Sequence, residues 1–180
     1  MAVVSADIKK RLSTQSGAAG NSTASTPAAS IGKYMSTTDI VDATVQNLFS
    51  NITAAEAAAG KTVYRCMFVY NSHASQSWDS VKVWMDSQTA GGGDVTIGLD
   101  PAGAVTYNQA GAQAAIPAND ITAPSGVVFS APTSEGAALS LGSIASLKCY
   151  AIWLKLVVPA DVSSINLDNV ILKVKGQSDP

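Results

Sequence analysis

The sequence is poor in charge, and this shortage limits the partners that it can bind. Charged residues make up 13% of its 180 residues, against roughly 25% in an average soluble protein. The net charge is −2, and Lys9, Lys10 and Arg11 form its one run of consecutive basic residues. A nucleic-acid binder carries a basic stripe, so we expect no nucleic-acid partner. Such a surface must be solvated by Ser, Thr, Asn and Gln, or be covered by other protein chains.

Long apolar runs are also missing. No stretch approaches the ~20 apolar residues that a membrane-spanning helix needs, so we expect no membrane partner. The opening residues MAVVSADIKK reach charged side chains too early to contain the apolar core of a signal peptide.

Residues that carry chemistry are few. The single histidine, His73, lies in the loop-like stretch NSHASQS, which excludes a site with two histidine ligands within one chain. Cys66 and Cys149 lie in strand-like runs, where a free cysteine usually behaves as a small buried hydrophobe, and whether they lie close together stays open. The thirteen carboxylates are scattered and match no calcium loop. We therefore predict a protein that is not an enzyme, with no catalytic residues, no metal site and no cofactor.

The N-terminal residues 1–33 are predicted to form an arm. SADIKKRL, residues 5–12, is typical of a short helix: Ser5 can cap it, and Ile8 and Leu12 share one face. Residues 13–32 contain no charge and consist almost wholly of Ser, Thr, Ala and Gly. This composition predicts a flexible linker between the helix and the folded domain.

Residues 34–180 read as one β domain. A helical turn follows TAAE, where Thr53 and Glu56 match a capping box, and it ends at Gly60. Residues 40–49 favour a strand or an extended segment, and residues 101–115 a loose loop. The other strand-like runs are 61–71, 78–87, 95–100, 116–122, 126–131, 137–141, 147–159 and 164–176. Six to eight mostly antiparallel strands predict an all-β fold, an antiparallel β-sandwich of Ig-like or jelly-roll-like type.

Three phrases of the sequence carry a resemblance. AAEAAAGKTVYRCMFVYNS, GVVFSAPTSEGAALSLGSI and YAIWLKLVVPA occur in this order, after the opening SADIKKRLST. In phrase and order the chain resembles small structural proteins of tailed bacteriophages. The resemblance implies a virion component, assembled in the host bacterial cytoplasm. It points first to a capsid decoration, or cement, protein that binds the major capsid protein or other virion proteins and stabilises the particle. It implies no catalytic residues.

The expected partner interface follows from the arm. We expect residues 1–33 to lie along a neighbouring subunit, with the interface formed by Ile8, Leu12, Ile31, Tyr34 and Trp78. The exposed strand candidate at 78–87 and the low charge also favour a homo-oligomer. Two alternatives remain open. One is a tail, baseplate or fibre-associated protein, and the other is a carbohydrate-binding β-sandwich whose tryptophans, Trp78, Trp84 and Trp153, stack on sugars.

Overall fold

The structure is a computed structural model that describes residues 2–19, 23–163 and 169–178. It is mostly β, and its strands form two antiparallel sheets. The strands are β1 (Ile8–Thr14), β2 (Tyr34–Asp39), β3 (Lys61–Asn71), β4 (Trp78–Gln88), β5 (Asp94–Thr106), β6 (Leu139–Ile144), β7 (Lys148–Val158) and β8 (Val170–Gln177). Sheet A has the order β2-β1-β3-β7-β5, and sheet B has the order β6-β4-β8.

Short helical elements connect some of the strands. They are the α-helix α1 (Ala54–Ala59) and the 3₁₀ turns η1 (Ser5–Asp7), η2 (Pro27–Ala29) and η3 (Glu135–Ala137). The helix begins as predicted, because Thr53 Oγ1 accepts from the Glu56 N–H and Glu56 Oε2 accepts from the Thr53 N–H. Gly60 follows with a φ of 75° and an extended ψ of 147°, so its positive φ agrees with the prediction but its ψ is not that of a left-handed helical cap.

The two sheets face each other across the main apolar core. Alternate residues of the strands point into it, as the period of two in the sequence predicts. The core residues include Met67 and Val69 from sheet A and Val81, Val83 and Met85 from sheet B. We call this the intersheet core.

The other side of sheet A is buried as well. The alternate residues of β3 and β7 point to this second face, among them Cys66, Phe68, Cys149 and Trp153. Phe68 and Trp153 are fully buried there, although no second sheet covers them. The cover consists of irregular segments, residues 107–131 and the described parts of residues 15–32. Side chains of the first segment pack on this face, and Ser30 of the second is hydrogen-bonded to Cys66.

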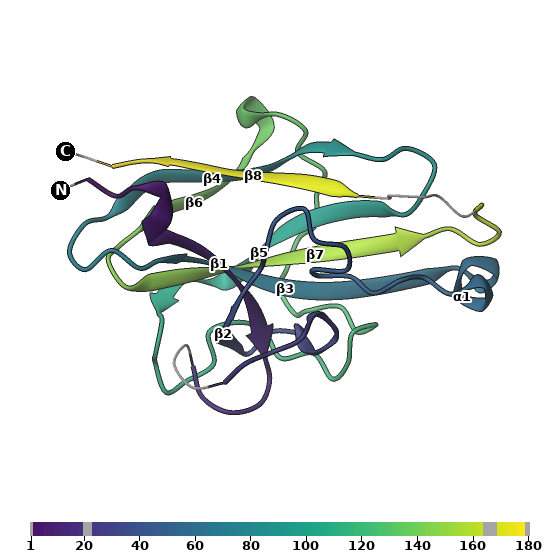
Figure 1. Ribbon diagram of the computed structural model, residues 1–180, viewed down its shortest axis with the longest axis horizontal. Coiled ribbons are helices and arrows are strands. Elements are labelled where there is room, and N and C mark those ends of the chain that lie inside the picture. Colours follow the sequence, from purple (N-terminus) through teal and green to yellow (C-terminus); the bar gives the residue numbers. More distant parts are fainter. Residues whose placement is uncertain (1, 20–22, 164–168, 179–180) are drawn as a thin grey trace.

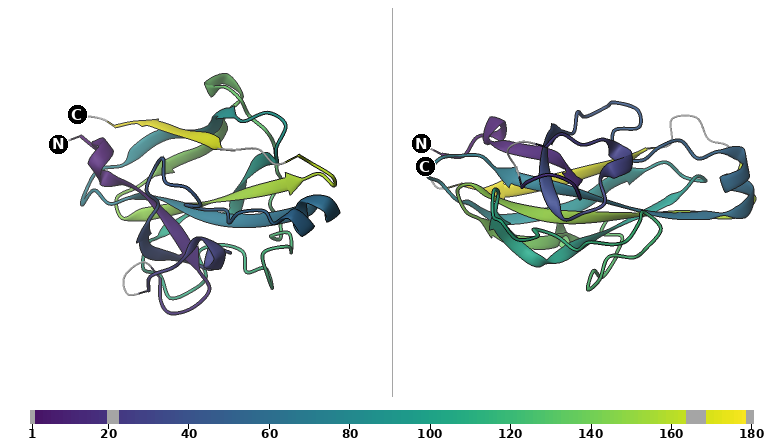
Figure 2. Two further views of the ribbon diagram at one scale, coloured as in Figure 1. Left: turned by 45° about the vertical axis from the view of Figure 1, so that its right-hand side comes forward. Right: turned by 90° about the horizontal axis from the view of Figure 1, so that it is seen from below.

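Figure 1 shows the resulting three layers, with sheet B at the top, sheet A in the middle and the two irregular segments below it. The view turned by 45° in Figure 2 shows the same layering. The two segments lie far apart in the sequence but meet in space.

The helix predicted over residues 5–12 is wrong. Only Ser5–Asp7 form a helical turn, and β1 follows, paired with β3 from Ile8↔Asn71 to Leu12↔Met67. Residues four apart share a face in a strand as well as in a helix, so the Ile8 and Leu12 spacing fits both. An isolated helix of this length is marginal in water, whereas the strand gains pairing partners and buries Leu12. Residues 8–14 are thus an interior strand of sheet A rather than part of a free arm.

Other differences from the prediction concern irregular chain. β5 runs on to Thr106 through residues predicted as loop, and residues 116–122 and 126–131 form no strand apart from a bridge between Ile97 and Ser130. Residues 40–49 form turns, whereas β2 was not predicted. The first part of the run at 164–176 lies outside the described residues. Whether a described segment forms a strand depends on pairing with a neighbouring strand, which composition does not specify.

Candidate functional site

The side chains that could take part in a reaction all have structural roles in the fold. The Nδ1 atom of His73 accepts from the backbone N–H groups of Ser75 (3.1 Å) and Gln76 (3.0 Å), so it holds the turn after β3 closed. The His73 N–H donates to Asn71 Oδ1 at 3.1 Å. A histidine bound in this way has no free Nδ1 to act as a general base.

The two cysteines are buried thiols on the second face of sheet A. Cys66 lies opposite Trp153 and Cys149 lies opposite Tyr70, so the register separates the thiols by four residues, about 13 Å along the strands. This is too far for a disulfide, and both cysteines are free. Burial raises the pKa of the Cys149 thiol to about 12, and burial also raises the pKa of Cys66 well above its usual value. Neither is a thiolate at neutral pH, so neither is an activated nucleophile.

Among the described residues, no group of three or more His, Cys, Asp or Glu side chains is placed to hold a metal ion. Within the described ranges, Asp100 is the one carboxylate that is buried, with 2% exposure. Its Oδ2 accepts from Trp153 Nε1 and from the Ala115 N–H, both at 2.8 Å, and its Oδ1 accepts from the Ala102 N–H at 3.0 Å. Sequence reasoning did not single out this residue as a site, because one Asp at the end of the predicted strand 95–100 carries no motif.

The feature that stands out is the cover of sheet A. We call residues 15–32 and 107–131 the uncharged layer. These 43 residues make up nearly a quarter of the chain but contain only one of its 24 charged residues, Asp120. That carboxylate is paired, since its Oδ2 accepts from Arg65 Nη1 at 3.0 Å. The layer therefore presents a surface of Ser, Thr, Asn, Gln and small side chains with no unpaired charge among its described residues. The cation of Lys33 lies at the border of the layer, where its Nζ donates to Gln15 O at 3.2 Å.

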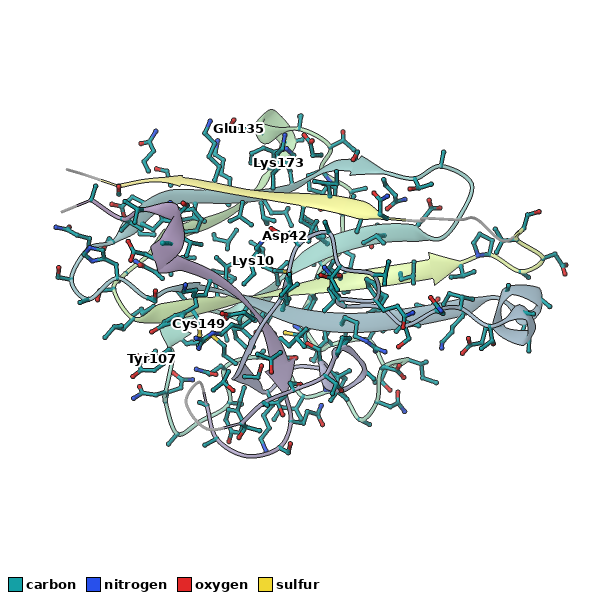
Figure 3. The ribbon with its side chains drawn as sticks, in the orientation of Figure 1. Lys10, Asp42, Tyr107, Glu135, Cys149 and Lys173 are labelled. Atoms are coloured by element: carbon teal, nitrogen blue, oxygen red, sulfur yellow. The ribbon has the colours of Figure 1, made fainter. Side chains whose placement is uncertain are left out.

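The opposite side of the molecule is different. Sheet B carries lysines and carboxylates on its outer surface, including the ion pairs Lys173–Asp86 and Lys175–Glu135, both at 2.9 Å. Figure 3 shows Lys173 and Glu135 at the top, whereas Tyr107 and Cys149 lie on the far side of sheet A. The outer surface of sheet B thus carries charged side chains, whereas the uncharged layer at the other end of the three-layer stack carries almost none.

Buried side chains hold the uncharged layer in place. Gln113 is fully buried: its Oε1 accepts from the Met35 N–H, and its Nε2 donates to Thr106 O, both at 2.7 Å. Ser30 Oγ donates to Cys66 O at 2.5 Å and accepts from the Ser13 N–H at 2.8 Å. Such directional bonds fix an irregular segment as firmly as strand pairing would.

The layer also completes the edge of β3. Because β1 pairs only with the later part of β3, the Tyr64 and Cys66 N–H groups have no strand beside them. They donate instead to Asp120 O (2.7 Å) and Ser30 O (2.8 Å), one from each segment of the layer. The two segments are joined to each other where Gln15 Nε2 donates to Pro117 O at 2.7 Å. The described residues of the layer are therefore an integral part of the fold.

Three aliphatic side chains project from this layer into solvent. Ile116, Ile121 and Val128 are 54%, 62% and 82% exposed. A shallow hollow also lies between the two segments, and no charged residue lines it. Its lining residues are Gly17, Ala18, Ala19, Tyr34, Asn108, Gln109 and Ala110. An interface core is typically depleted in charge and contains apolar side chains, so the layer is the candidate functional site.

The structure separates the five predicted interface residues. Ile31 belongs to the uncharged layer, and Tyr34 lines its hollow with Lys33 Nζ 4.9 Å from the ring centre. Leu12 and Trp78 are buried in the intersheet core, and Ile8 is partly buried against it. Leu12 and Trp78 therefore offer little surface to a partner, whereas Ile8 keeps part of its surface exposed. The absence of charge in residues 13–32 could have indicated part of this surface from the sequence. That these residues lie beside residues 107–131 is seen only in the folded chain.

The three tryptophans are all buried, with 8% exposure for Trp78, 7% for Trp84 and none for Trp153. None of them can stack on a sugar from solution. No helix in the described part of the chain has the length and apolar content needed to cross a membrane. Comparison with family models, with curated proteins and with solved structures gives no match.

Proposed function

We propose that the chain is a structural component of a bacteriophage virion and not an enzyme, most specifically a decoration protein that stabilises the capsid. The observation that carries the proposal is the uncharged layer, an ordered surface that is suited to being covered by protein. The resemblance of three sequence phrases to phage structural proteins supports the same function. We further propose that the two sheets form a β-sandwich of Ig-like or jelly-roll-like type.

The physical logic of a decoration protein fits this molecule. A protein that binds only the assembled particle adds its binding free energy to the stability of that particle. Such a protein needs a rigid surface rather than a reactive site. The described side chains that could take part in a reaction all make contacts inside the chain instead. They are His73, Cys66, Cys149 and Asp100.

The test is to purify particles of the encoding phage and to measure the copies of this chain per particle. We expect a fixed copy number that matches the symmetry of the head, and particles lacking the chain should lose their genome at a lower temperature. A fixed copy number on isolated tails would support the alternative of a tail, baseplate or fibre-associated protein. Absence of the chain from washed heads and tails would overturn the proposal.

The carbohydrate-binding alternative loses its motivating feature, since no tryptophan is exposed. The proposal also shifts the expected interface from residues 1–33 as a whole to the uncharged layer. Deleting residues 2–32 would remove β1, an interior strand of sheet A, so we expect that deletion to unfold the protein.

A further inference from the structure

The uncharged layer is chemically complementary to itself. Hydroxyl and amide side chains both donate and accept hydrogen bonds, so such a surface can bond to a copy of itself. Lysine only donates and a carboxylate only accepts, so a charged surface can pair with its own copy only where each lysine meets a carboxylate that is not already paired. The outer surface of sheet B is of that second kind, because it carries Lys82, Lys173 and Lys175 beside Asp86 and Glu135.

We infer that the uncharged layer binds the same layer of a second copy of this chain. A two-fold contact brings the same patch of both subunits together, so the patch has to be self-complementary. In this arrangement the hydroxyl and amide groups pair across the interface, and Ile116, Ile121 and Val128 supply its apolar contacts. The charged outer surfaces of both copies of sheet B then face solvent, where they keep the dimer soluble.

The positions of the exposed aliphatic side chains suit such a contact. The chain at Ile121 is tied to β3 through Asp120, and the chain at Val128 lies over β5, where Ser130 and Ile97 exchange backbone hydrogen bonds. β3 and β5 lie two places apart in sheet A, about 10 Å. Ile116 lies earlier in the same segment, next to Pro117, whose carbonyl accepts from Gln15 Nε2. The three side chains are thus spread across the layer rather than collected at one end.

The size of the layer is sufficient. A standard interface covers about 800 Å² on each partner, which is roughly a tenth of the accessible surface of 8669 Å². The layer has 40 described residues, at 15–19, 23–32 and 107–131, so a contact of this size fits within it. The layer is also held by buried hydrogen bonds from Gln113, Asp100 and Ser30, so little ordering is needed on binding.

This inference rests on the proposed function only in treating the layer as a protein-binding surface, and it names the partner. The test measures the mass of the full chain in solution by sedimentation equilibrium over ~1 to 300 µM. We expect a dimer of twice 18.3 kDa. Because no ion pair is needed across the contact, its dissociation constant should change less than about threefold between 0.05 and 0.5 M NaCl.

Two substitutions place a charge in the proposed contact. Ile121→Asp and Val128→Asp should each weaken the dimer by about 100-fold or more, since the two-fold axis buries two unpaired carboxylates. Both side chains project into solvent, so the monomer should keep its circular dichroism spectrum and melting temperature. Val45→Asp and Ile171→Asp are matched controls, because these residues are 76% and 48% exposed but lie outside the layer. They should leave the dissociation constant within about threefold of its original value.

Three results would overturn the inference: a monomer at all concentrations, a dimer that survives both layer substitutions, or a dimer that the controls weaken equally. Binding of the same variants to phage particles separates this inference from the proposed function. A monomer that still binds particles through the layer removes the second copy as partner and leaves the virion role intact. A layer-dependent dimer that is absent from particles supports the inference and removes the virion role.

Discussion

One face of sheet A packs on sheet B through aliphatic side chains, whereas the other packs under the uncharged layer through aromatic side chains and buried polar groups. The intersheet core includes Ile152, Leu154 and Leu156 from β7. The alternate residues Ala151 and Trp153 of the same strand point to the second face. The strand therefore supplies two cores of different character from alternate positions.

The difference follows from what each face is packed against. A sheet satisfies its own backbone groups, so the intersheet core needs only apolar volume. An irregular layer has backbone groups with no strand partner, and each of them is costly to bury without a hydrogen bond. Asp100, Gln113 and Ser30 supply those bonds on the second face. The intersheet core should therefore tolerate changes of shape, and the second face should not tolerate changes of hydrogen bonding.

The largest effect is expected for Asp100→Ala. The substitution leaves three N–H groups without their acceptor, those of Trp153, Ala115 and Ala102. Since an unsatisfied buried donor costs about 1–3 kcal/mol, we expect the free energy of unfolding to fall by about 3–5 kcal/mol. Urea unfolding measures this loss, and the near-ultraviolet circular dichroism of Trp153 should change with it. A loss below about 1 kcal/mol would contradict the account of the second face.

Two conservative substitutions test whether the faces differ in kind. Asp100→Asn keeps the shape but replaces one acceptor with a donor, so it should still cost about 2 kcal/mol. Leu154→Met keeps the apolar volume in the intersheet core, where Leu154 is 1% exposed, and should cost less than about 1.5 kcal/mol. Equal costs would mean that hydrogen bonding does not set the second face apart.

The next effect is expected at Gln113, and it should be local. Gln113→Ala removes the acceptor of the Met35 N–H and the donor to Thr106 O. We expect a loss of about 2–3 kcal/mol, because both backbone groups lose a buried partner. Hydrogen exchange should show lost protection at Met35, while amides of β4 in sheet B keep their relative order of protection. A uniform loss across both sheets would show that the layer and the intersheet core open together.

The sequence predicts the intersheet core better than the second face, because the first depends on apolar alternation and the second on individual hydrogen bonds. The alternation in residues 61–71 assigns Met67 and Val69 to one face and Cys66 and Phe68 to the other, and the structure confirms both assignments. Alternation depends only on residue type and position. The cover of the second face depends on single polar residues that reach backbone groups up to 78 residues away, as Gln113 reaches Met35. No local pattern marks such a residue.

The same limit explains the error at the N-terminus. The spacing of Ile8 and Leu12 fits a helix and a strand equally, and only the free edge of β3 decides between them. Residues 13–32 contain too little apolar surface to fold alone, but Ser13 and Ser30 are bound to the sheet by hydrogen bonds. The sequence therefore shows that these residues lack charge, but it does not show that they form a surface together with residues 107–131.

A smaller effect is expected at Ser30. Ser30→Ala removes the hydroxyl that bridges the Ser13 N–H and Cys66 O, so we expect a loss of about 1–2 kcal/mol. Thr26→Ala, four residues away, is the matched control, since Thr26 is exposed and its side chain makes no capping bond. It should change stability by less than about 0.5 kcal/mol. If the two substitutions have equal effects, the buried hydroxyl does not anchor the layer.

The smallest effect is expected outside both faces, at α1, and it should depend on pH. The hydrogen bond from Lys61, with those from Thr53, lowers the pKa of Glu56 to about 2. A carboxyl whose pKa is lower in the folded state contributes stability above its unfolded pKa of about 4.5, and this contribution is lost as the pH falls towards 2. Glu56→Gln should therefore lower the melting temperature slightly at pH 7, and the difference from the original protein should shrink between pH 4.5 and 2. Figure 1 shows α1 at one end of the molecule, and the partners of Glu56 are Thr53 and Lys61, which lie outside the uncharged layer. The Asp100→Ala loss should therefore keep its size in the Glu56→Gln background. A loss that changes by more than about 0.5 kcal/mol would show that α1 and the second face are coupled.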